Sequence, residues 1–403
     1  MNILILTHRV PFPQNGGYPI VVGNTIRGLV DKGHTVSLIS LNEKKETGKQ
    51  VAQDELLDRI DHRVFNIDTS ISMMGALIKL LGKQSTSTDR YYDAGFEKFL
   101  IAEVKKKEFD IIQFEGLFVA TYLESVRKNT KAKLIYRAHN IEHQVWERVA
   151  LQKQDPLKRW FVNLVARRIK KYELQQIKGF DGISVFTQQD KKTIESYELN
   201  VNLEVIPVGI DMDHYRPEPR KTQFPSLFFL GSLDWMPNRE GIEWFLENFH
   251  NDIVNGELRT KFYVAGNDIP EQFDEYEALD KIYIKGEVDN ALEFVNSKSV
   301  MIVPLLSGGG MRVKIVEGMA MQKCIISTSL GAEGIQYHDG GNIIIANTRQ
   351  EFYDAIQRCT ADEEYCKQIG LNARRMIEAQ HDIGAITTRL VMFYKRVLPK
   401  DVN

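Results

Sequence analysis

Short apolar runs alternate along this chain with longer stretches of helical periodicity. Asn2–Thr7 is the first such run, and a loop rich in proline and glycine follows it. Pro19 then opens an amphipathic stretch that Gly33 stops, and Thr35–Leu41 is the next apolar run. Strand, loop, helix and strand in this order predict an α/β fold with parallel strands. Further strands are expected at Asp110–Phe114, Lys133–Arg137, Gly182–Phe186 and Leu203–Pro207.

A second series of the same kind begins at Ser226. Between the two series, Val208–Pro219 carries Gly209 and two prolines and is predicted to be an interdomain connection. We therefore expect two domains, residues 1–206 and 207–382, followed by a helix in residues 383–403. The expected strands are Leu227–Leu230, Lys261–Ala265, Ile282–Lys285, Val300–Val303, Cys324–Thr328 and Asn342–Ala346; the expected helices are Gly241–Asn248, Arg349–Thr360, Glu363–Gln380 and Ile383–Val397.

Ser307–Glu317 joins an apolar run, Val300–Leu306, to a helix start. Gly308, Gly309 and Gly310 lie at the junction, where glycine lets a ligand approach the backbone closely. The unpaired N–H groups of a helix start favour an anion. The stretch therefore predicts a phosphate site, against the alternative of a glycine-rich turn with solvated charges.

The charges after the glycines support the phosphate site. Arg312 and Lys314 fall in the first helical turn, where cations oppose the helix dipole. A phosphate between them would remove that conflict. Glu317 lies one turn after Lys314, placed to accept hydrogen bonds from sugar hydroxyls.

Other candidates lie at strand ends, where open parallel sheets place catalytic groups. His139 follows the strand Lys133–Arg137, and Gly16 and Gly17 follow the first strand. A structural histidine and a plain turn are the alternatives; we favour function for His139, with His143 as support. Ser85–Asp89 is predicted to be a flexible loop near an acceptor site.

Composition narrows the class of protein. The net charge of -2 argues against nucleic acid as the main partner. The three cysteines lack metal-ligand spacing, and so few of them indicate a reducing compartment. No signal peptide or membrane span is recognisable, so we expect a cytoplasmic protein.

Two further features have competing interpretations. Residues 157–178 form a basic amphipathic helix, which fits peripheral contact with an anionic inner membrane or a solvated helix on its own domain; we favour the second. Asp211 and Asp213 form a D-x-D pair like the metal site of some sugar transferases, but their setting favours a linker.

Several motifs together resemble glycosyltransferase family 4 over nearly the whole chain. They are G-G-Y, R-A-H-N-I-E, V-I-P-V-G-I-D-x-x-x-Y, F-L-G-S-L-D-W-x-P-N, V-A-G, I-K-G-E-V and the long G-G-G-M-R-V-K-I-V-E-G-M-A-M-Q-K-C-I-I-S-T-S-L-G-A-E-G. The resemblance implies the GT-B fold, two Rossmann-like domains facing each other across a cleft, with the last helix returning to the first domain. It also implies transfer of a sugar from a nucleotide-diphosphate donor, with retention at the anomeric carbon, to a carbohydrate or lipid-linked acceptor.

The resemblance also implies residue roles. Glu317 matches the second Glu of the family's E-x7-E signature, which binds the donor ribose, and His139 matches the His near the reacting sugar. Gly286 to Val288 match the segment that meets the base. The expected catalytic residues are His139, Arg312, Lys314 and Glu317; the expected donor-binding residues are Gly16, Gly17, Ser232, Gly286, Val288, Gly308, Gly309, Gly310 and Met311.

The chain departs from the family pattern at two places. Gly309 occupies the position of the first Glu of E-x7-E. Ser232 occupies the position of the family's Arg after F-L-G. The family's Lys that acts with this Arg is matched at best by Arg239. Arg312 and Lys314 could supply the missing charge, as in the G-x-G-x-R-x-K-x-x-E subset, so no metal or other cofactor is expected. A nucleotide-sugar epimerase and a transferase-like scaffold that has lost catalysis stay as alternatives.

Overall fold

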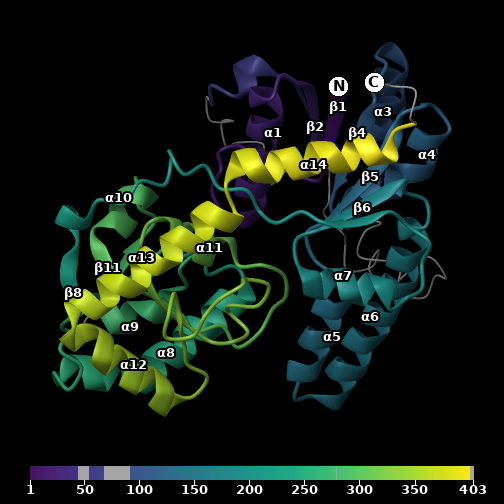
Figure 1. The fold of residues 1–403 in the computed structure, drawn as a ribbon. Coiled ribbons are helices and arrows are strands. Elements are labelled where there is room, and N and C mark those ends of the chain that lie inside the picture. Colours follow the sequence, from purple (N-terminus) through teal and green to yellow (C-terminus); the bar gives the residue numbers. More distant parts are fainter. Residues whose placement is uncertain (44–53, 68–90, 278, 400–403) are drawn as a thin grey trace. The chain divides into compact units, whose positions relative to one another are not determined.

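The chain forms two compact units in the computed structural model, which describes residues 1–43, 54–67, 91–277 and 279–399 (Figure 1). Unit 1 comprises Met1–Pro207 and Gly384–Asn403, and unit 2 comprises Val208–Ile383. The expected divisions were after residues 206 and 382. Ser85–Asp89 lies outside the described residues. None of the helices in the described ranges combines the length and the apolar content that a membrane span requires.

Unit 1 contains a parallel sheet in the order β3-β2-β1-β4-β5-β6-β7. Successive strands are added on one side of β1 up to β3 and on the other side from β4 onward, so the strand order reverses between β1 and β4. Ligands of open α/β sheets bind at such a point. The strands are β1 (Asn2–Thr7), β2 (Thr35–Glu43), β3 (Asp61–Ile67), β4 (Ile111–Glu115), β5 (Lys133–Ala138), β6 (Gly182–Val185) and β7 (Leu203–Val205). The helices include α1 (Gly17–Asp31), α3 (Ala94–Lys106), α4 (Leu123–Arg127), α5 (Glu142–Gln152), α6 (Pro156–Ile177), α7 (Gln188–Glu195) and α14 (Ile383–Val397).

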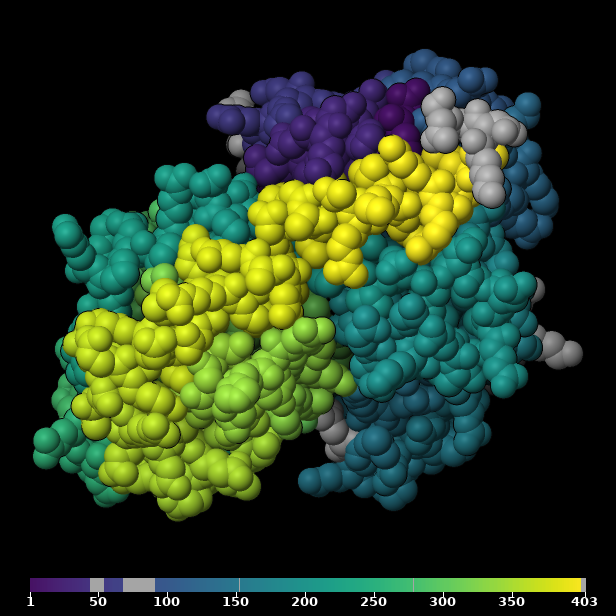
Figure 2. Space-filling model, viewed as in Figure 1, coloured from purple at the N-terminus to yellow at the C-terminus, as the bar shows by residue number. Residues whose placement is uncertain are grey.

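The strands of unit 1 bury both faces, as their continuous apolar sequences require. Ile3 and Ile5 of β1 pack on one side with α1 and α14, whereas Leu4 and Leu6 pack on the other side with α3. Helix α14 lies as a yellow ridge between purple α1 and teal residues of the same unit (Figure 2), and its Arg389 donates to the Val205 carbonyl of β7 over 2.9 Å. It approaches α1 closely at Gly28, where a Cβ atom would lie 2.0 Å from the Thr387 hydroxyl.

Unit 2 has a second parallel sheet, in the order β10-β9-β8-β11-β12-β13, with its reversal between β8 and β11. Its strands are β8 (Gln223–Leu230), β9 (Phe262–Ala265), β10 (Ile282–Gly286), β11 (Lys298–Val303), β12 (Cys324–Ser327) and β13 (Ile344–Ile345). Its helices include α8 (Met236–Val254), α9 (Asp274–Glu277), α10 (Ala291–Asn296), α11 (Val313–Ala320), α12 (Arg349–Ala361) and α13 (Glu363–Gln380). The α/β class expected from the hydrophobic pattern is confirmed, as two Rossmann-like units.

The structure corrects two expectations about elements. Helix α8 begins at Met236, not at Gly241, because Pro237 occupies its first turn, where the missing N–H costs nothing. The segment Val208–Pro219 is more than a connection. Val208, Ile210 and Tyr215 are buried, and Ile210 exchanges backbone hydrogen bonds with His381 and Ile383, so the segment is part of unit 2.

Candidate active site

The loop between β11 and α11 holds the glycine-rich stretch. Gly308 and Gly310 have φ angles of 102° and 78°, which favour glycine. Arg312 is the N-cap of α11 and is 5% exposed. Its guanidinium donates to the carbonyl oxygens of Gly309 and Gly310 and lies 5.2 Å from the Trp235 ring. Arg312 therefore stabilises the conformation of the glycine loop through hydrogen bonds to its backbone.

Lys314, in the first turn of α11, is the second cation of the predicted pair. Its Nζ donates to Asn238 Oδ1 over 2.9 Å and lies 4.1 Å from the centre of the Phe229 ring. Gly231, at the end of β8, leaves room for it, because a Cβ atom there would lie 2.5 Å from Nζ. Burial, with the Arg312 charge adding to it, lowers the pKa of Lys314 to about 7.

Glu317 lies one turn further along α11. Its Oε1 accepts a hydrogen bond of 2.6 Å from the Tyr215 hydroxyl. Burial raises the pKa of Glu317 to about 7, although the Tyr215 hydrogen bond and the Lys314 charge oppose that shift. Arg374 of α13 donates to the Tyr215 carbonyl over 2.7 Å and so holds the segment that carries this tyrosine.

These contacts are chemically suited to an anion joined to a hydroxyl-bearing group. Lys314 is a half-buried lysine whose pKa is lowered by burial and by Arg312 more than Glu317 raises it, and it lies at the N-terminal turn of a helix. The structure thus brings Lys314 and Glu317 together with the glycine loop, as the sequence predicted.

The other residues predicted in unit 2 lie at the same carboxyl edge of its sheet. Ser232 follows β8, and its hydroxyl donates to Asp234 Oδ1 over 2.6 Å, so it faces a carboxylate. Gly286 ends β10 with a φ of 66°, and Val288, two residues on, is half-buried. Met311 is half-buried in the glycine loop.

In unit 1, His139 lies directly after β5 and is 12% exposed. Its Nε2 lies 2.6 Å from Oε2 of Glu115, the fully buried last residue of β4. Burial lowers the pKa of His139, so the ring is neutral at pH 7 although Glu115 opposes the shift. Since Nε2 must carry the proton toward an ionised carboxylate, Nδ1 of His139 is left as an acceptor.

Glu115 stays ionised because of its neighbours. Burial alone would raise its pKa, but the Arg137 guanidinium, 4.0 Å away, and His139 outweigh burial and lower it. Gln113 donates to Glu115 Oε1 over 2.5 Å, and the Tyr394 hydroxyl of α14 donates to Gln113. A buried chain of hydrogen bonds thus runs from α14 to His139.

Gly16 and Gly17 lie at the start of α1, beside His139. Gly16 is the N-cap, with a φ of 102°. The next residue, Tyr18, has its ring centre 4.7 Å from that of His139 and donates its hydroxyl to the Glu115 carbonyl over 3.3 Å. The start of α1 therefore contacts the histidine, although β4 lies between β1 and β5 in the sheet.

His143 does not support His139. It is buried, with Nδ1 2.6 Å from Glu173 of α6 and Nε2 2.7 Å from the Tyr197 hydroxyl. These bonds join α5 to α6 and to the end of α7. The expectation of a second functional histidine is therefore not supported, and the alternative of a structural histidine fits the contacts of His143.

Three residues of these sites had no assigned role from the sequence. Tyr215 and Asn238 stand inside motifs that were recognisable, the final Y of V-I-P-V-G-I-D-x-x-x-Y and the final N of F-L-G-S-L-D-W-x-P-N. Glu115 had a weaker signal, a carboxylate at the end of a strand. Asp211, by contrast, accepts hydrogen bonds from the backbone N–H groups of Asp213 and His214, as a turn residue does.

Two Rossmann-like units, each with a parallel sheet, are the architecture of the GT-B fold, and solved structures of this fold match the chain. Sucrose-phosphate synthase from Thermosynechococcus elongatus superposes with a TM-score of 0.72, at 14% identity over 98% of this chain and 99% of that one. A glycosyltransferase from Rickettsia africae gives 0.68 at 17% identity, covering 99% of both chains. Anabaena Alr3699/HepE in complex with UDP and glucose gives 0.66 at 13% identity, covering 98% of this chain and 100% of that one.

Family models match most of the sequence. The model for Glycosyltransferase Family 4 matches residues 15–214, and that for Glycosyl transferases group 1 matches residues 224–362. The chain belongs to glycosyltransferase family 4. A protein of Klebsiella pneumoniae, described as an uncharacterized 44.6 kDa protein in the cps region, is 24% identical over 94% of this chain and 96% of its own length.

Proposed function

We propose that this protein transfers a hexose from a nucleotide-diphosphate sugar to an acceptor hydroxyl, with retention at the anomeric carbon. The observation that carries the proposal is Lys314, a half-buried lysine at a helix start with Glu317 one turn away. The diphosphate would meet Lys314 and the N–H groups of the glycine loop, and the ribose would meet Glu317. The Anabaena relative was solved with UDP and glucose, which supports a nucleotide sugar as donor.

The chemistry requires stabilisation of the diphosphate as it leaves. Fixed cations and backbone N–H groups in a site of low dielectric do this well, so the mechanism needs no metal. We propose front-face substitution: the bond from the anomeric carbon to the diphosphate oxygen breaks, the acceptor oxygen bonds on the same face, and its proton passes to the leaving phosphate. Retention and this mechanism follow the family resemblance.

His139 would act on the transferred sugar, not as a formal base. Its neutral ring offers Nδ1 as an acceptor, and Glu115 holds the tautomer. Gly309 stands where the family has a carboxylate that contacts the donor sugar, and its carbonyl accepts from Arg312. Recognition of the donor sugar would therefore use groups other than that carboxylate.

We further propose an acceptor of the cell envelope, a polysaccharide or a lipid-linked sugar. The Klebsiella pneumoniae relative, described as lying in a cps region, supports it. So does the surface where α5 ends and α6 begins. Leu157 and Trp160 are 76% and 64% exposed there, beside exposed Leu151 and Phe161 and the cations Lys158 and Arg159. Exposed apolar and basic side chains together fit an anionic membrane surface.

A thermal-shift panel of UDP, GDP, ADP, CMP and dTDP, each with magnesium and with EDTA, tests the donor proposal. A ligand at 100 times its dissociation constant stabilises the folded protein by about 2.7 kcal/mol. We expect one diphosphate to raise Tm equally in both conditions. A shift that needs magnesium would contradict the metal-free site.

The alternatives give other results. A scaffold that has lost catalysis, which the missing carboxylate at Gly309 favours, would show no shift from any nucleotide. An epimerase would bind the nucleotide and convert the donor sugar without an acceptor. Incubating the donor alone and analysing the sugar separates the epimerase from the transferase.

A further inference from the structure

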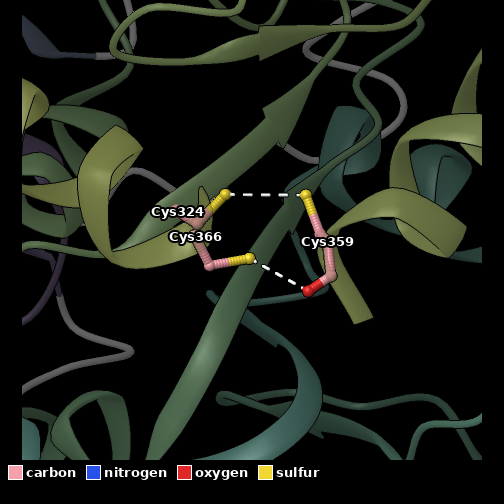
Figure 3. Close-up of side chains that lie close together, drawn as sticks. All are labelled: Cys324, Cys359 and Cys366. Atoms are coloured by element: carbon pink, nitrogen blue, oxygen red, sulfur yellow. Dashed lines mark hydrogen bonds between the residues drawn. The ribbon is translucent and has the colours of Figure 1, made fainter. Parts of the chain in front are cut away.

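All the cysteines of this chain meet at one point inside unit 2. Cys324 begins β12, Cys359 lies in α12 and Cys366 in α13, and the sequence contains no other cysteine. Each one is buried in the apolar core of the unit. Their three sulfur atoms lie within 4.8 Å of one another, and Figure 3 shows them converging from the three elements.

The distances suit a shared ion. Sγ of Cys324 lies 3.8 Å from Sγ of Cys359, and Sγ of Cys366 lies 3.1 Å from the Cys359 carbonyl oxygen. Sulfur atoms that bind one ion at about 2.3 Å are themselves about 3.8 to 4.0 Å apart. An ion could therefore contact all three sulfurs after small side-chain rotations, without movement of the elements that carry them.

The donor set selects the kind of ion. Thiolate sulfur favours soft metals such as Cu(I) and disfavours magnesium or calcium. Among the described residues, no histidine or carboxylate joins the three sulfurs as a further ligand. Zinc prefers four ligands in structural sites, whereas a dry site with three sulfurs fits an ion of low coordination number.

Charges and access at the cluster are also compatible with an ion. Arg358, next to Cys359, stacks 3.9 Å from the centre of the Tyr365 ring, and Tyr365 is next to Cys366. Arg358 supplies a positive charge beside the sulfurs that would bind as thiolates. Arg358 and Tyr365 also line a surface cavity of about 380 Å³, so solvent reaches the chain one residue away from two of the cysteines.

We propose that Cys324, Cys359 and Cys366 form a buried site for a soft, thiophilic metal ion, for which Cu(I) has the fitting softness and coordination number. The bound ion links β12, α12 and α13. Helix α13 also carries Arg374, whose guanidinium donates hydrogen bonds to the carbonyl oxygens of Tyr215 and Ala320. By fixing α13, the ion also stabilises the positions of the Tyr215 segment and of the end of α11. The site does not depend on the transferase function.

Titration of the reduced, full-length protein with Cu(I) held by a chromogenic chelator tests the proposal. We expect one Cu(I) per chain and a higher Tm in its presence. Cys324→Ser, Cys359→Ser and Cys366→Ser should each weaken binding by more than about tenfold, since each removes one ligand. Met392→Leu, which removes an exposed thioether, should leave binding unchanged.

The wild-type protein keeps the test decisive if a serine variant fails to fold. Absence of stoichiometric Cu(I) uptake by the folded wild type would overturn the proposal. So would uptake that persists in a folded Cys324→Ala/Cys359→Ala variant. If the wild type takes up no Cu(I) but diamide, a thiol oxidant, joins Cys324 to Cys359, the metal site is likewise overturned and the pair is a redox couple.

Discussion

At the scale of single residues, the main feature is that Lys314 and Glu317 both have pKa values near 7. For Lys314, whose pKa in the folded protein lies below its ordinary value, the unfolded chain binds more protons, so its burial costs stability that is recovered as pH rises. A bound diphosphate would favour the protonated amine. Nucleotide affinity should therefore be highest below about pH 7 and fall above it, as binding must then take up a proton.

Replacing Lys314 by Met separates the two effects. Without nucleotide, Lys314→Met should be more stable at pH 7 by about 1–4 kcal/mol, because the cost of removing the amine from water is lost. With nucleotide, its thermal shift should disappear. Calorimetry at pH 8 in buffers of different ionisation enthalpy should show proton uptake in the wild type only. Lys367→Met, at an exposed lysine of α13, is the control. If Lys314→Met bound nucleotide as tightly as the wild type, Lys314 would not be a ligand.

Glu115 is a positioning residue for His139. In Glu115→Gln, the amide oxygen can accept from Gln113, which turns the amide NH₂ toward His139 and favours the opposite tautomer. We expect kcat to fall by about 10- to 100-fold with little change in KM, a loss typical of groups that orient a functional residue. Glu124→Gln, at an exposed carboxylate of the same unit, should be neutral.

The contrary result for Glu115 would be informative. A variant with normal kcat, or one with a raised KM alone, would mean that the tautomer of His139 does not matter to transfer. The kcat of His139→Ala, measured in the same assay, gives the upper limit of the effect. If Glu115 acts only through His139, Glu115→Gln cannot lower kcat by more than His139→Ala does.

At the scale of elements, α6 divides into two parts. Its later turns are packed against unit 1 through four buried side chains, those of Ala166, Ile169, Glu173 and Ile177. Its first turns carry the exposed apolar side chains. The expectation of a helix that packs on its own domain therefore holds for the later turns only. A packed second half would hold the exposed first half at a fixed orientation.

Vesicle sedimentation tests the exposed turns of α6. We expect the wild type to bind vesicles that contain phosphatidylglycerol more strongly than phosphatidylcholine vesicles, and less strongly as salt rises. Leu157→Gln/Trp160→Gln should reduce this binding several-fold. Met392→Gln, equally exposed at 64% on α14, is the matched control. Equal binding by the double variant would exclude this surface as the contact.

Elements were predictable from the sequence where periodicity was strong, and contacts were not. The glycine loop and α11 were expected because a strand, three glycines and a helical pattern follow one another. The start of α8 was missed because the Gly231–Asn238 stretch reads as a loop. Strand β3 and helix α3 lie in a stretch without clear periodicity. The cysteines gave no signal, since their spacing in sequence says nothing about the convergence of β12, α12 and α13.

Partners far apart in sequence were the least predictable part of the sites. Tyr215 meets Glu317 across 102 positions, and Tyr394 reaches Gln113 across 281. The identity of each residue was visible, but pairing depends on the order of strands in each sheet. Glu115 illustrates this, because its role follows only once β4 is known to lie beside β5.

At the scale of the whole molecule, unit 1 is made from two separate pieces of chain. Removal of residues 384–403 takes Leu390, Phe393, Tyr394 and Val397 from its core. Each buried apolar side chain contributes about 1.5–3 kcal/mol, and a whole domain is stable by only about 5–15 kcal/mol. The truncated protein should therefore lose the cooperative unfolding transition of unit 1.

Unit 2 should survive this truncation, because Val208–Ile383 is one continuous segment with its own core. Scanning calorimetry of the truncated chain is expected to show one transition, and that transition should still shift with whichever nucleotide stabilises the full-length protein in the thermal-shift panel. Two intact transitions would mean that α14 contributes little to unit 1.

The late position of α14 also bears on the order of events during synthesis. Domains ordinarily fold in the order in which they leave the ribosome, the amino-terminal one first. In this protein, unit 1 is the first unit whose synthesis begins and the last whose synthesis is completed. The sheet of unit 1 is translated early, but the face that α14 covers stays open until the chain has passed residue 397, after all of unit 2 has been made. A nascent chain with an uncovered apolar sheet face is a substrate for chaperones, and we expect this protein to engage them for longer than a chain of continuous domains.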